Sequence, residues 1–221
     1  MDTFSYPGSD GHPLHATRLG MGPAAILLPD SGGPYGSGGP HSPGGPDHRG
    51  LLPLARRLAD SYTVTVAETR DADDVASLVG HLGLRKAAVG GTGTGAAIAL
   101  RAAADDPEHI AAAVVINADD LAPEDIAHTF GRMAALAAVS APTLIIPGGE
   151  RHHRRHAHPH RHTHAPGLAE ELARVLPQGK LANLSFSADL CSAEDMAQWM
   201  APAMWAFLTA HLTLRPARVL V

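Results

Sequence analysis

The sequence contains one cysteine, Cys191, so no disulfide can form within the chain and a cysteine-rich zinc site is excluded. Aromatic residues are also scarce, at 4% of the 221 residues. The longest apolar runs, such as 111–116, are far too short to cross a bilayer. The N-terminus has neither the basic nor the apolar segment of a signal peptide. These absences predict a cytoplasmic protein that does not bind membranes.

An excess of basic residues is also lacking, since 17 Lys and Arg face 22 Asp and Glu, for a formal charge of −5. This balance argues against a nucleic-acid-binding protein, which needs a basic surplus to displace counterions. Hydrophobic residues at 45% and charged residues at 18% are typical of a globular protein. We therefore expect a single domain over residues 1–221, with a core of Ala, Val, Leu and Ile.

Short apolar runs alternate with helical patterns through most of the sequence. Strands are expected at 24–29, 62–67, 86–90, 110–116, 143–146 and 181–186. Helices are expected at 51–58, 73–82, 95–104, 123–139, 168–176 and 193–212. This rhythm predicts an α/β fold with a mostly parallel sheet and helices on both faces.

Two segments interrupt the pattern, each directly after a predicted strand. Residues 30–50 form a Gly/Pro-rich loop and residues 151–164 a His/Arg-rich loop. Open α/β sheets form their binding crevice at the carboxyl ends of the strands. Both loops are therefore candidates to line a site, and the alternative is that both are solvated surface loops.

Several segments resemble the α/β-hydrolase family in the right order. "ADDVASLVGHLGLRKAAVGGTGTGAAIALRAAADDPEHIAAAVVINA" resembles its helix-strand-elbow-helix-strand unit, and "APTLIIPGGE" the strand before its acid loop. "LSFSADLCSAEDMAQWMAPAMWAFL" resembles its last strand, histidine loop and closing helix. The resemblance covers about residues 24–210 and implies an α/β-hydrolase-type sheet. Only residues 119–140 separate two strands where relatives insert a lid, which implies a minimal cap.

The resemblance fails at the residues that carry the chemistry. The family places its nucleophile in a G-x-S-x-G elbow, whereas residues 91–95 read GTGTG and put Gly93 at the serine position. Aligning the histidine loop puts Leu190 at the position of the base, and Glu150 is the carboxylate nearest to the position of the acid. Because a triad acts as a unit, we expect no serine-type hydrolysis.

Two residues of the histidine loop are candidates to replace the lost groups. Cys191 could act as a nucleophile if a partner activated it, and Asp189 could act as an acid or base in a dry pocket. The alternatives are a small packed core residue for Cys191 and a carboxylate facing water for Asp189.

The oxyanion donors of the family map to the Thr94 amide and to about Asp30 and Ser31. A ligand is expected over Gly93, where such amides could bind a carbonyl, carboxylate or enolate oxygen, although Asp30 would disfavour a full negative charge. The side chains of Thr92 and Thr94 are expected to point away from the serine position. The predicted ligand-binding residues are Asp30, Ser31, Thr92, Gly93 and Thr94.

Seven histidines fall within the His/Arg-rich loop: His152, His153, His156, His158, His160, His162 and His164. Neutral imidazole binds zinc, copper and nickel, but Arg151, Arg154, Arg155 and Arg161 would repel a cation. The prediction is therefore no cofactor, with an adventitious divalent metal at this loop and a functional metal site or pH-responsive role as the alternatives.

Three functions remain open after these observations. The first is a pseudoenzyme that binds a small molecule or a protein partner through the former active-site pocket, with a homodimer as one form of the latter. The second is a non-hydrolytic enzyme (a lyase, cyclase or isomerase) that reuses the pocket and the oxyanion amides. The third, an active hydrolase with displaced residues, ranks below both.

Overall fold

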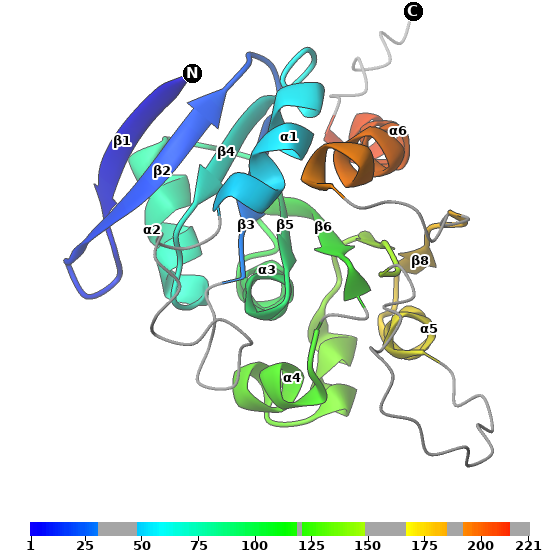
Figure 1. Ribbon diagram of the computed structural model, residues 1–221. Coiled ribbons are helices and arrows are strands. Elements are labelled where there is room, and N and C mark those ends of the chain that lie inside the picture. Colours follow the sequence, from blue (N-terminus) through cyan, green and yellow to red (C-terminus); the bar gives the residue numbers. More distant parts are fainter. Residues whose placement is uncertain (31–47, 119–120, 149–166, 185–191, 213–221) are drawn as a thin grey trace, which may run out of the picture.

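The computed structural model describes residues 1–30, 48–118, 121–148, 167–184 and 192–212. These residues form an eight-stranded sheet in the order β1-β2-β4-β3-β5-β6-β7-β8 (Figure 1). Its strands are β1 (Asp2–Pro7), β2 (Pro13–Leu19), β3 (Ala24–Leu28), β4 (Thr63–Ala67), β5 (Ala87–Thr92), β6 (Ile110–Ile116), β7 (Thr143–Ile145) and β8 (Gly179–Leu181). Strand β2 is antiparallel to β1 and to β4. All other neighbouring strands, from β4 through β3, β5, β6 and β7 to β8, pair in parallel. The sheet is thus mostly parallel, as the sequence predicts.

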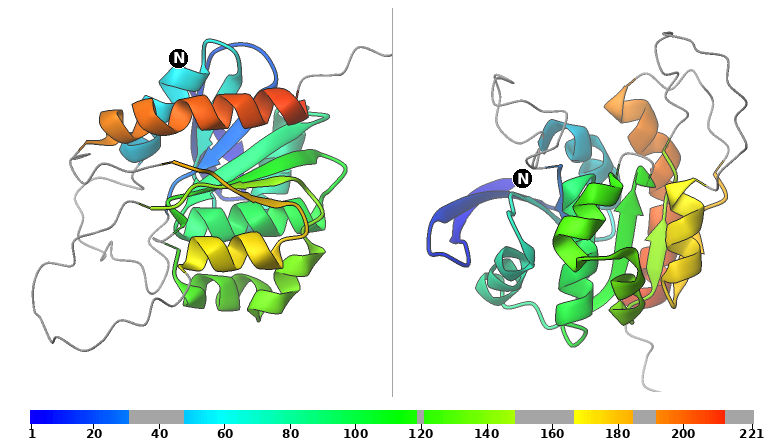
Figure 2. Two further views of the ribbon diagram at one scale, coloured as in Figure 1. Left: turned by 90° about the vertical axis from the view of Figure 1, so that its right-hand side faces the viewer. Right: turned by 90° about the horizontal axis from the view of Figure 1, so that it is seen from below.

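Helices cover both faces of the sheet (Figures 1 and 2). Helices α1 (His48–Leu58) and α6 (Ala193–Leu212) lie on one face. The other carries α2 (Ala72–His81), α3 (Thr94–Asp105), α4 (Pro123–Phe130), the 3-10 helix η2 (Met133–Ala138) and α5 (Leu168–Val175). None of the helices in the described ranges combines the length and apolar character needed to span a membrane.

The core consists of two layers because the central strands bury both of their faces. Neighbouring residues of β3 alternate between the layers: Leu27 packs with α1 and α6, and Leu28 with α2 and α3. Each of the five residues of β3 is buried. Such continuous apolar runs are typical of the inner strands of a parallel sheet, and this is why the sequence pattern located them.

Most of the predicted elements are confirmed within one or two residues, and two are wrong in part. The helix expected over 123–139 ends at Phe130, because Gly131 adopts a left-handed backbone with φ of 74° and the chain continues as a 3-10 helix. The strand expected over 181–186 begins earlier, at Gly179, and ends at Leu181. The hairpin of β1 and β2 was not predicted, because it exposes one face and buries few large side chains.

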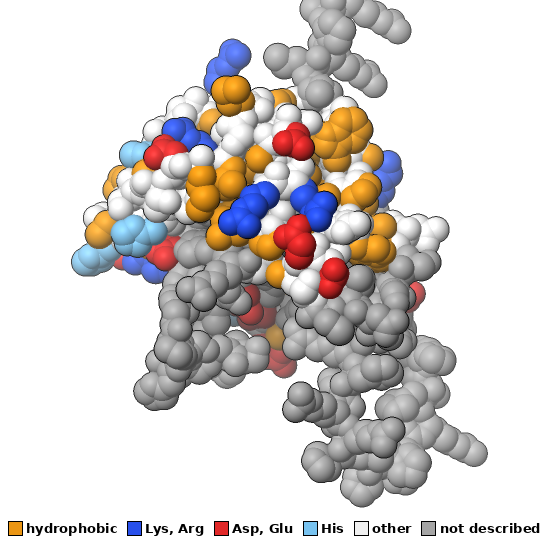
Figure 3. Space-filling view, turned by 45° about the horizontal axis from the view of Figure 1, so that its top comes forward, with side chains coloured by type: hydrophobic (Ala, Val, Ile, Leu, Met, Phe, Trp, Pro, Cys, Tyr) orange, Lys and Arg blue, Asp and Glu red, His pale blue; other side chains and the backbone are white. Residues whose placement is uncertain are grey.

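The face formed by α1 and α6 combines charged and apolar side chains (Figure 3). Arg57 of α1 donates a hydrogen bond to Glu194 of α6 at 2.7 Å. Trp205 of α6 is 49% exposed, and its indole N–H donates to the hydroxyl of Ser61 at 3.2 Å. Nothing in these contacts bears on the predicted homodimer, which stays a prediction.

A buried carboxylate attaches the outer hairpin to the rest of the domain. Asp74 of α2 is fully buried and accepts hydrogen bonds from the amides of Ser9, at 2.7 Å, and Arg70, at 2.8 Å. The guanidinium of Arg70 also pairs with Asp74 and with Asp10 in the hairpin turn. Burial by itself would raise the pKa of Asp74, but the hydrogen bonds from Ser9 and Arg70 outweigh burial and hold that pKa below its ordinary value.

We expect Asp74→Asn to lower the free energy of unfolding by about 2–3 kcal/mol at pH 7, because an amide cannot accept all of these bonds. Since the folded-state pKa of Asp74 lies below the ordinary value of 3.8, the contribution of the carboxylate is present above that pH. It is lost as the pH falls through the folded-state pKa. Urea unfolding at pH 7 and pH 3 should therefore show a large difference from wild type at pH 7 and a smaller one at pH 3.

The control is Asp73→Asn, which removes an exposed carboxylate one residue earlier on the same helix. It should change the free energy of unfolding by no more than about 0.5 kcal/mol. Equal effects of the two substitutions would contradict the role of Asp74.

Candidate functional site

The carboxyl ends of three central strands bring together Asp30, Gly93 and Asn117. Within the sheet, Leu28 of β3 pairs with Gly91 of β5, and Thr92 of β5 pairs with Ile116 of β6. Asp30 and Gly93 lie two residues beyond the first pair, and Gly93 and Asn117 directly follow the second. Residues that are far apart in the sequence therefore meet at one edge of the sheet.

Gly93 forms a sharp turn between β5 and α3, with φ of 50° and ψ of −128°. Only glycine adopts this conformation without strain. The flanking glycines serve a different purpose, since a Cβ on Gly91 would lie 2.4 Å from the carbonyl carbon of Gly95. A Cβ on Gly95 would lie 2.5 Å from the carbonyl oxygen of Leu28. The turn thus requires glycine once for its backbone angle and twice for close packing.

The carboxylate of Asp30 lies directly over Gly93. A Cβ on Gly93 would come within 2.7 Å of the Asp30 Cγ. The hydroxyl of Thr94 donates to Oδ1 of Asp30 at 2.7 Å, and the Thr94 amide donates to the same oxygen at 3.3 Å. The amide of Asp30 donates to Oγ1 of Thr92 at 3.2 Å. Asp30 therefore fills the space that a side chain at position 93 would enter.

This arrangement corrects one expectation and changes another. The side chain of Thr94 was expected to point away from this space, and that is wrong, because its hydroxyl binds the carboxylate that fills it. The Thr94 amide, predicted to donate to a ligand, already donates to Asp30. The sequence placed Asp30, Thr92, Gly93 and Thr94 together correctly, but not the contact between the carboxylate and the turn.

Asn117 is a residue of this edge that the sequence analysis missed. It has a φ of 52° and is the one non-glycine residue with positive φ in the described part of the chain. Its Oδ1 is also the one buried side-chain polar atom without a hydrogen-bond partner among those residues. The left-handed backbone costs about 1–2 kcal/mol, and an unsatisfied buried acceptor about 1–3 kcal/mol. An asparagine directly after a buried apolar strand was the signal in the sequence.

No family model and no curated protein matches the sequence. Solved structures do match the fold. An α/β hydrolase from Sphaerobacter thermophilus is 20% identical, with a TM-score of 0.63 over 93% of this chain and 100% of that one. Est1E from Butyrivibrio proteoclasticus is 11% identical, with a TM-score of 0.66 over 95% and 100%. A meta-cleavage product hydrolase from Pseudomonas fluorescens is 13% identical, with a TM-score of 0.53 over 80% and 87%.

The chain has the α/β-hydrolase fold. In this fold the nucleophile stands on the turn between a strand and the following helix, and the backbone amide of the next residue forms part of the oxyanion hole. The turn at Gly93 occupies that place in the topology, between β5 and α3. That Gly93 stands at the nucleophile position, with Thr94 supplying the adjacent amide, stays a prediction.

The remaining predicted site residues lie outside the described residues. They are Ser31, Glu150, Asp189, Leu190, Cys191 and the seven histidines between 152 and 164. The assignment of Leu190 to the position of the base and of Glu150 to that of the acid stays a prediction. The same holds for a metal at the histidine loop.

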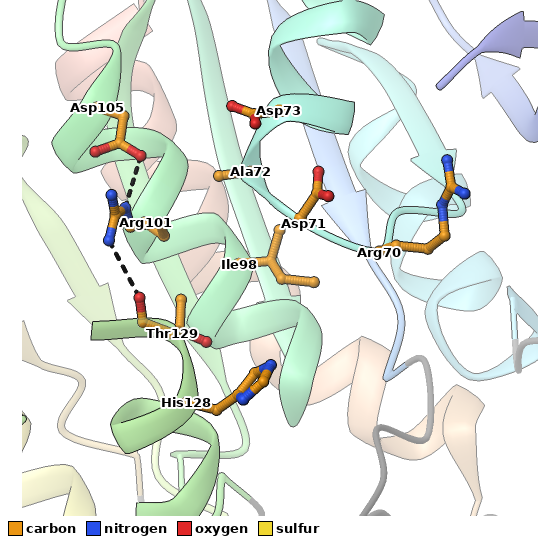
Figure 4. Close-up of a pocket in the computed structure, with 9 residues that line it drawn as sticks. All are labelled: Arg70, Asp71, Ala72, Asp73, Ile98, Arg101, Asp105, His128 and Thr129. Carbon is orange, nitrogen blue, oxygen red and sulfur yellow. Dashed lines mark hydrogen bonds and ion pairs between the residues drawn. The ribbon is translucent and has the colours of Figure 1, made fainter. Parts of the chain in front are cut away.

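A cavity of about 270 Å³ lies away from the turn, between the start of α2, the helix α3 and the end of α4 (Figure 4). Arg101 on its wall donates to Asp105 at 2.6 Å and to the carbonyl oxygen of Thr129 at 3.2 Å. Asp71 caps α2 by accepting from the Asp74 amide at 2.9 Å. The guanidinium of Arg70 is directed away from the other lining residues. Arg101 and Asp71 thus stabilise the surrounding helices, whereas Arg70 pairs with Asp74 and with Asp10 of the hairpin turn.

The contact between Asp30 and Gly93 predicts a coupling that unfolding experiments can measure. We expect Gly93→Ala to lower the free energy of unfolding by roughly 1–3 kcal/mol, because the new Cβ meets Asp30 and the positive φ is strained. In the double variant with Asp30→Ala the steric part disappears, so the effects of the two substitutions should fail to add by about 1 kcal/mol. Urea unfolding of both single variants and the double variant gives this coupling.

The control is Gly80→Ala on α2, where an added Cβ meets nothing within 4 Å. This substitution should stabilise the protein by roughly 0.5–1 kcal/mol, because alanine favours the helix. Additive effects of Asp30→Ala and Gly93→Ala would show that the carboxylate does not constrain position 93.

Proposed function

We propose that this α/β-hydrolase-fold protein is a pseudoenzyme that binds a small molecule at the edge of the sheet around Gly93 and does not hydrolyse it. The observation that supports this most is the carboxylate of Asp30, which fills the space of the nucleophile side chain and accepts the Thr94 amide. A protein partner at the same edge is the alternative ligand.

The chemistry of ester hydrolysis supports the absence of turnover. An acyl transfer needs a nucleophile with an adjacent base, and Gly93 offers no side chain. It also needs amide donors aimed at the negative oxygen of the tetrahedral intermediate. The Thr94 amide is engaged by a carboxylate, whose negative charge would repel that oxygen. Nucleophile and oxyanion stabilisation are therefore both compromised at the same place.

One observation favours a second function, a lyase, cyclase or isomerase. The carboxylate of Asp30 is positioned by hydrogen bonds to the hydroxyl and amide of Thr94, and the Asp30 amide is bonded to Thr92. A carboxylate held in this way can take a proton from a bound substrate. Such an enzyme would depend on Asp30 and would not need a nucleophile at position 93.

We expect no hydrolysis of p-nitrophenyl acetate above a buffer blank. Gly93→Ser should give no burst of p-nitrophenol, because an unactivated hydroxyl is a poor nucleophile and its Cβ would meet Asp30. Adding Asp30→Ala removes the steric conflict without supplying a base, so this double variant should be equally inactive. Stopped-flow absorbance on repurified protein makes the measurement.

Turnover by the wild-type protein that survives repurification would contradict the proposed function. If Asp30→Ala then abolished that turnover, Asp30 would be a displaced nucleophile or base and the chain an active hydrolase. The matched control is Asp73→Ala, an exposed carboxylate outside the site.

A further inference from the structure

Two features that oppose stability at the site belong to one residue, Asn117. Its backbone is left-handed, and its buried Oδ1 lacks a hydrogen-bond partner among the described residues. Buried polar atoms in folded proteins are nearly always paired, and strained backbones persist where the surroundings hold them and are concentrated at functional sites. A left-handed backbone and an unpaired buried oxygen at the same residue do not stabilise the fold, so they indicate that Asn117 has a role in function.

Neighbouring contacts fix the position of Asn117. On one side Ile116 pairs with Thr92, the residue before the Gly93 turn. On the other side the Ala118 amide donates to the carbonyl oxygen of Ile146 at 2.8 Å, so the backbone directly after Asn117 is held by the residue that follows β7. Asn117 is half-buried as a whole and its Oδ1 is buried, so a molecule that pairs with Oδ1 requires a change in the torsion angles of this side chain.

The polarity of this edge is the reverse of that of a hydrolase site. An oxyanion hole presents N–H donors to the oxygen of its substrate. Here the Thr94 amide and hydroxyl both donate to Asp30, while the acceptor of Asn117 is unsatisfied. The negative charge of Asp30 favours hydrogen-bond donors and cations in its surroundings. A ligand that presents N–H groups suits such a site, and a carboxylate or ester does not.

We propose that Asn117 is a ligand-binding residue, and that it selects a small molecule bearing an amide, amidine or amine N–H donor, which bonds to Oδ1 of Asn117 at the same edge of the sheet as Asp30. This inference rests on the proposed function, since it names the class of ligand for the same site. It assigns the strained and unsatisfied asparagine to recognition instead of stability.

Four probes with the same ring and nearly the same size test the ligand class: benzamidine, benzamide, methyl benzoate and benzoate. Benzamidine and benzamide carry N–H donors, whereas methyl benzoate and benzoate offer acceptors only. Titrating each into ¹⁵N-labelled protein should shift the amide signals of residues 92–95 and 117–118 with the first two probes. The proposal would be overturned if only benzoate or methyl benzoate shifted those signals, or if none of the four probes shifted them.

Two substitutions at position 117 separate recognition from structure. Asn117→Gly keeps the positive φ without strain and removes the unsatisfied oxygen, so it should raise the midpoint of thermal unfolding by about 2–4 °C. It should also weaken benzamidine binding about tenfold, the equivalent of one hydrogen bond. Asn117→Asp retains an acceptor of the same shape and should retain benzamidine binding. The control Asn183→Gly makes the same change at an exposed residue and should leave binding unchanged.

The outcomes distinguish this inference from the proposed function. Probe binding near Gly93 that Asn117→Gly leaves unchanged would overturn the role of Asn117 and leave the binding function standing. Loss of binding in Asn117→Asp as well as in Asn117→Gly would show that the acceptor is not what the ligand recognises. Release of methanol from methyl benzoate in the same sample, absent without protein, would instead contradict the proposed function.

Discussion

The close packing of helix α3 onto strands β3 and β5 is the contact on which the site depends. Gly91 and Gly95 allow the backbone of the helix to approach the two strands at distances that no Cβ would permit. Small residues continue this pattern along α3, whose buried side chains are mostly alanine. The approach fixes where the helix begins and therefore forces the turn at Gly93. The small side chains of α3 are thus a requirement of this contact, because bulky residues on α3 would move it away from the sheet.

A glycine at the turn leaves space over the sheet, and Asp30 fills that space. The chain needs no side chain at position 93 to keep the turn, since glycine adopts the required angles more easily than serine does. The hydroxyl of Thr94 then provides the bond that orients the carboxylate. The turn between β5 and α3 here holds the carboxylate of a residue that follows β3. The close approach of helix and strands depends on Gly91 and Gly95, and Gly93 supplies the backbone angle of the turn between them.

The sequence predicted those parts of the structure whose side chains are buried in a regular pattern. Strands β3 and β6 are continuous apolar runs, and α6 was predicted at its observed bounds, 193–212. The hairpin of β1 and β2 was missed because few of its side chains are buried, Tyr6 being the one buried residue of β1. The helix over 123–139 was extended too far because its apolar spacing continues past Gly131, where the backbone turns left-handed. Periodicity reports which face is buried, and it does not report where a backbone angle breaks the helix.

At the site, the sequence predicted the positions and not the contacts. The elbow at 91–95 was visible because its glycines are adjacent in the chain, whereas the bond between Thr94 and Asp30 joins residues that are 64 positions apart. Asn117 was not recognised, because asparagine is common in turns and its identity alone does not show strain. The unsatisfied Oδ1 is a property of the surroundings, and only the structure reveals it.

Asn117 and Asp30 favour the same kind of ligand for different reasons. The unpaired acceptor of Asn117 is unfavourable for folding, whereas the carboxylate of Asp30 accepts hydrogen bonds from the hydroxyl and the amide of Thr94. In the proposed function, a ligand with N–H donors would pair with Oδ1 of Asn117 and lie in the negative field of Asp30. The free energy that the unpaired acceptor costs the folded protein would then contribute to binding. An oxyanion hole presents donors to a negative oxygen, whereas the Thr94 amide at this edge donates to a carboxylate. This difference in polarity is the reason for proposing a ligand that carries N–H donors.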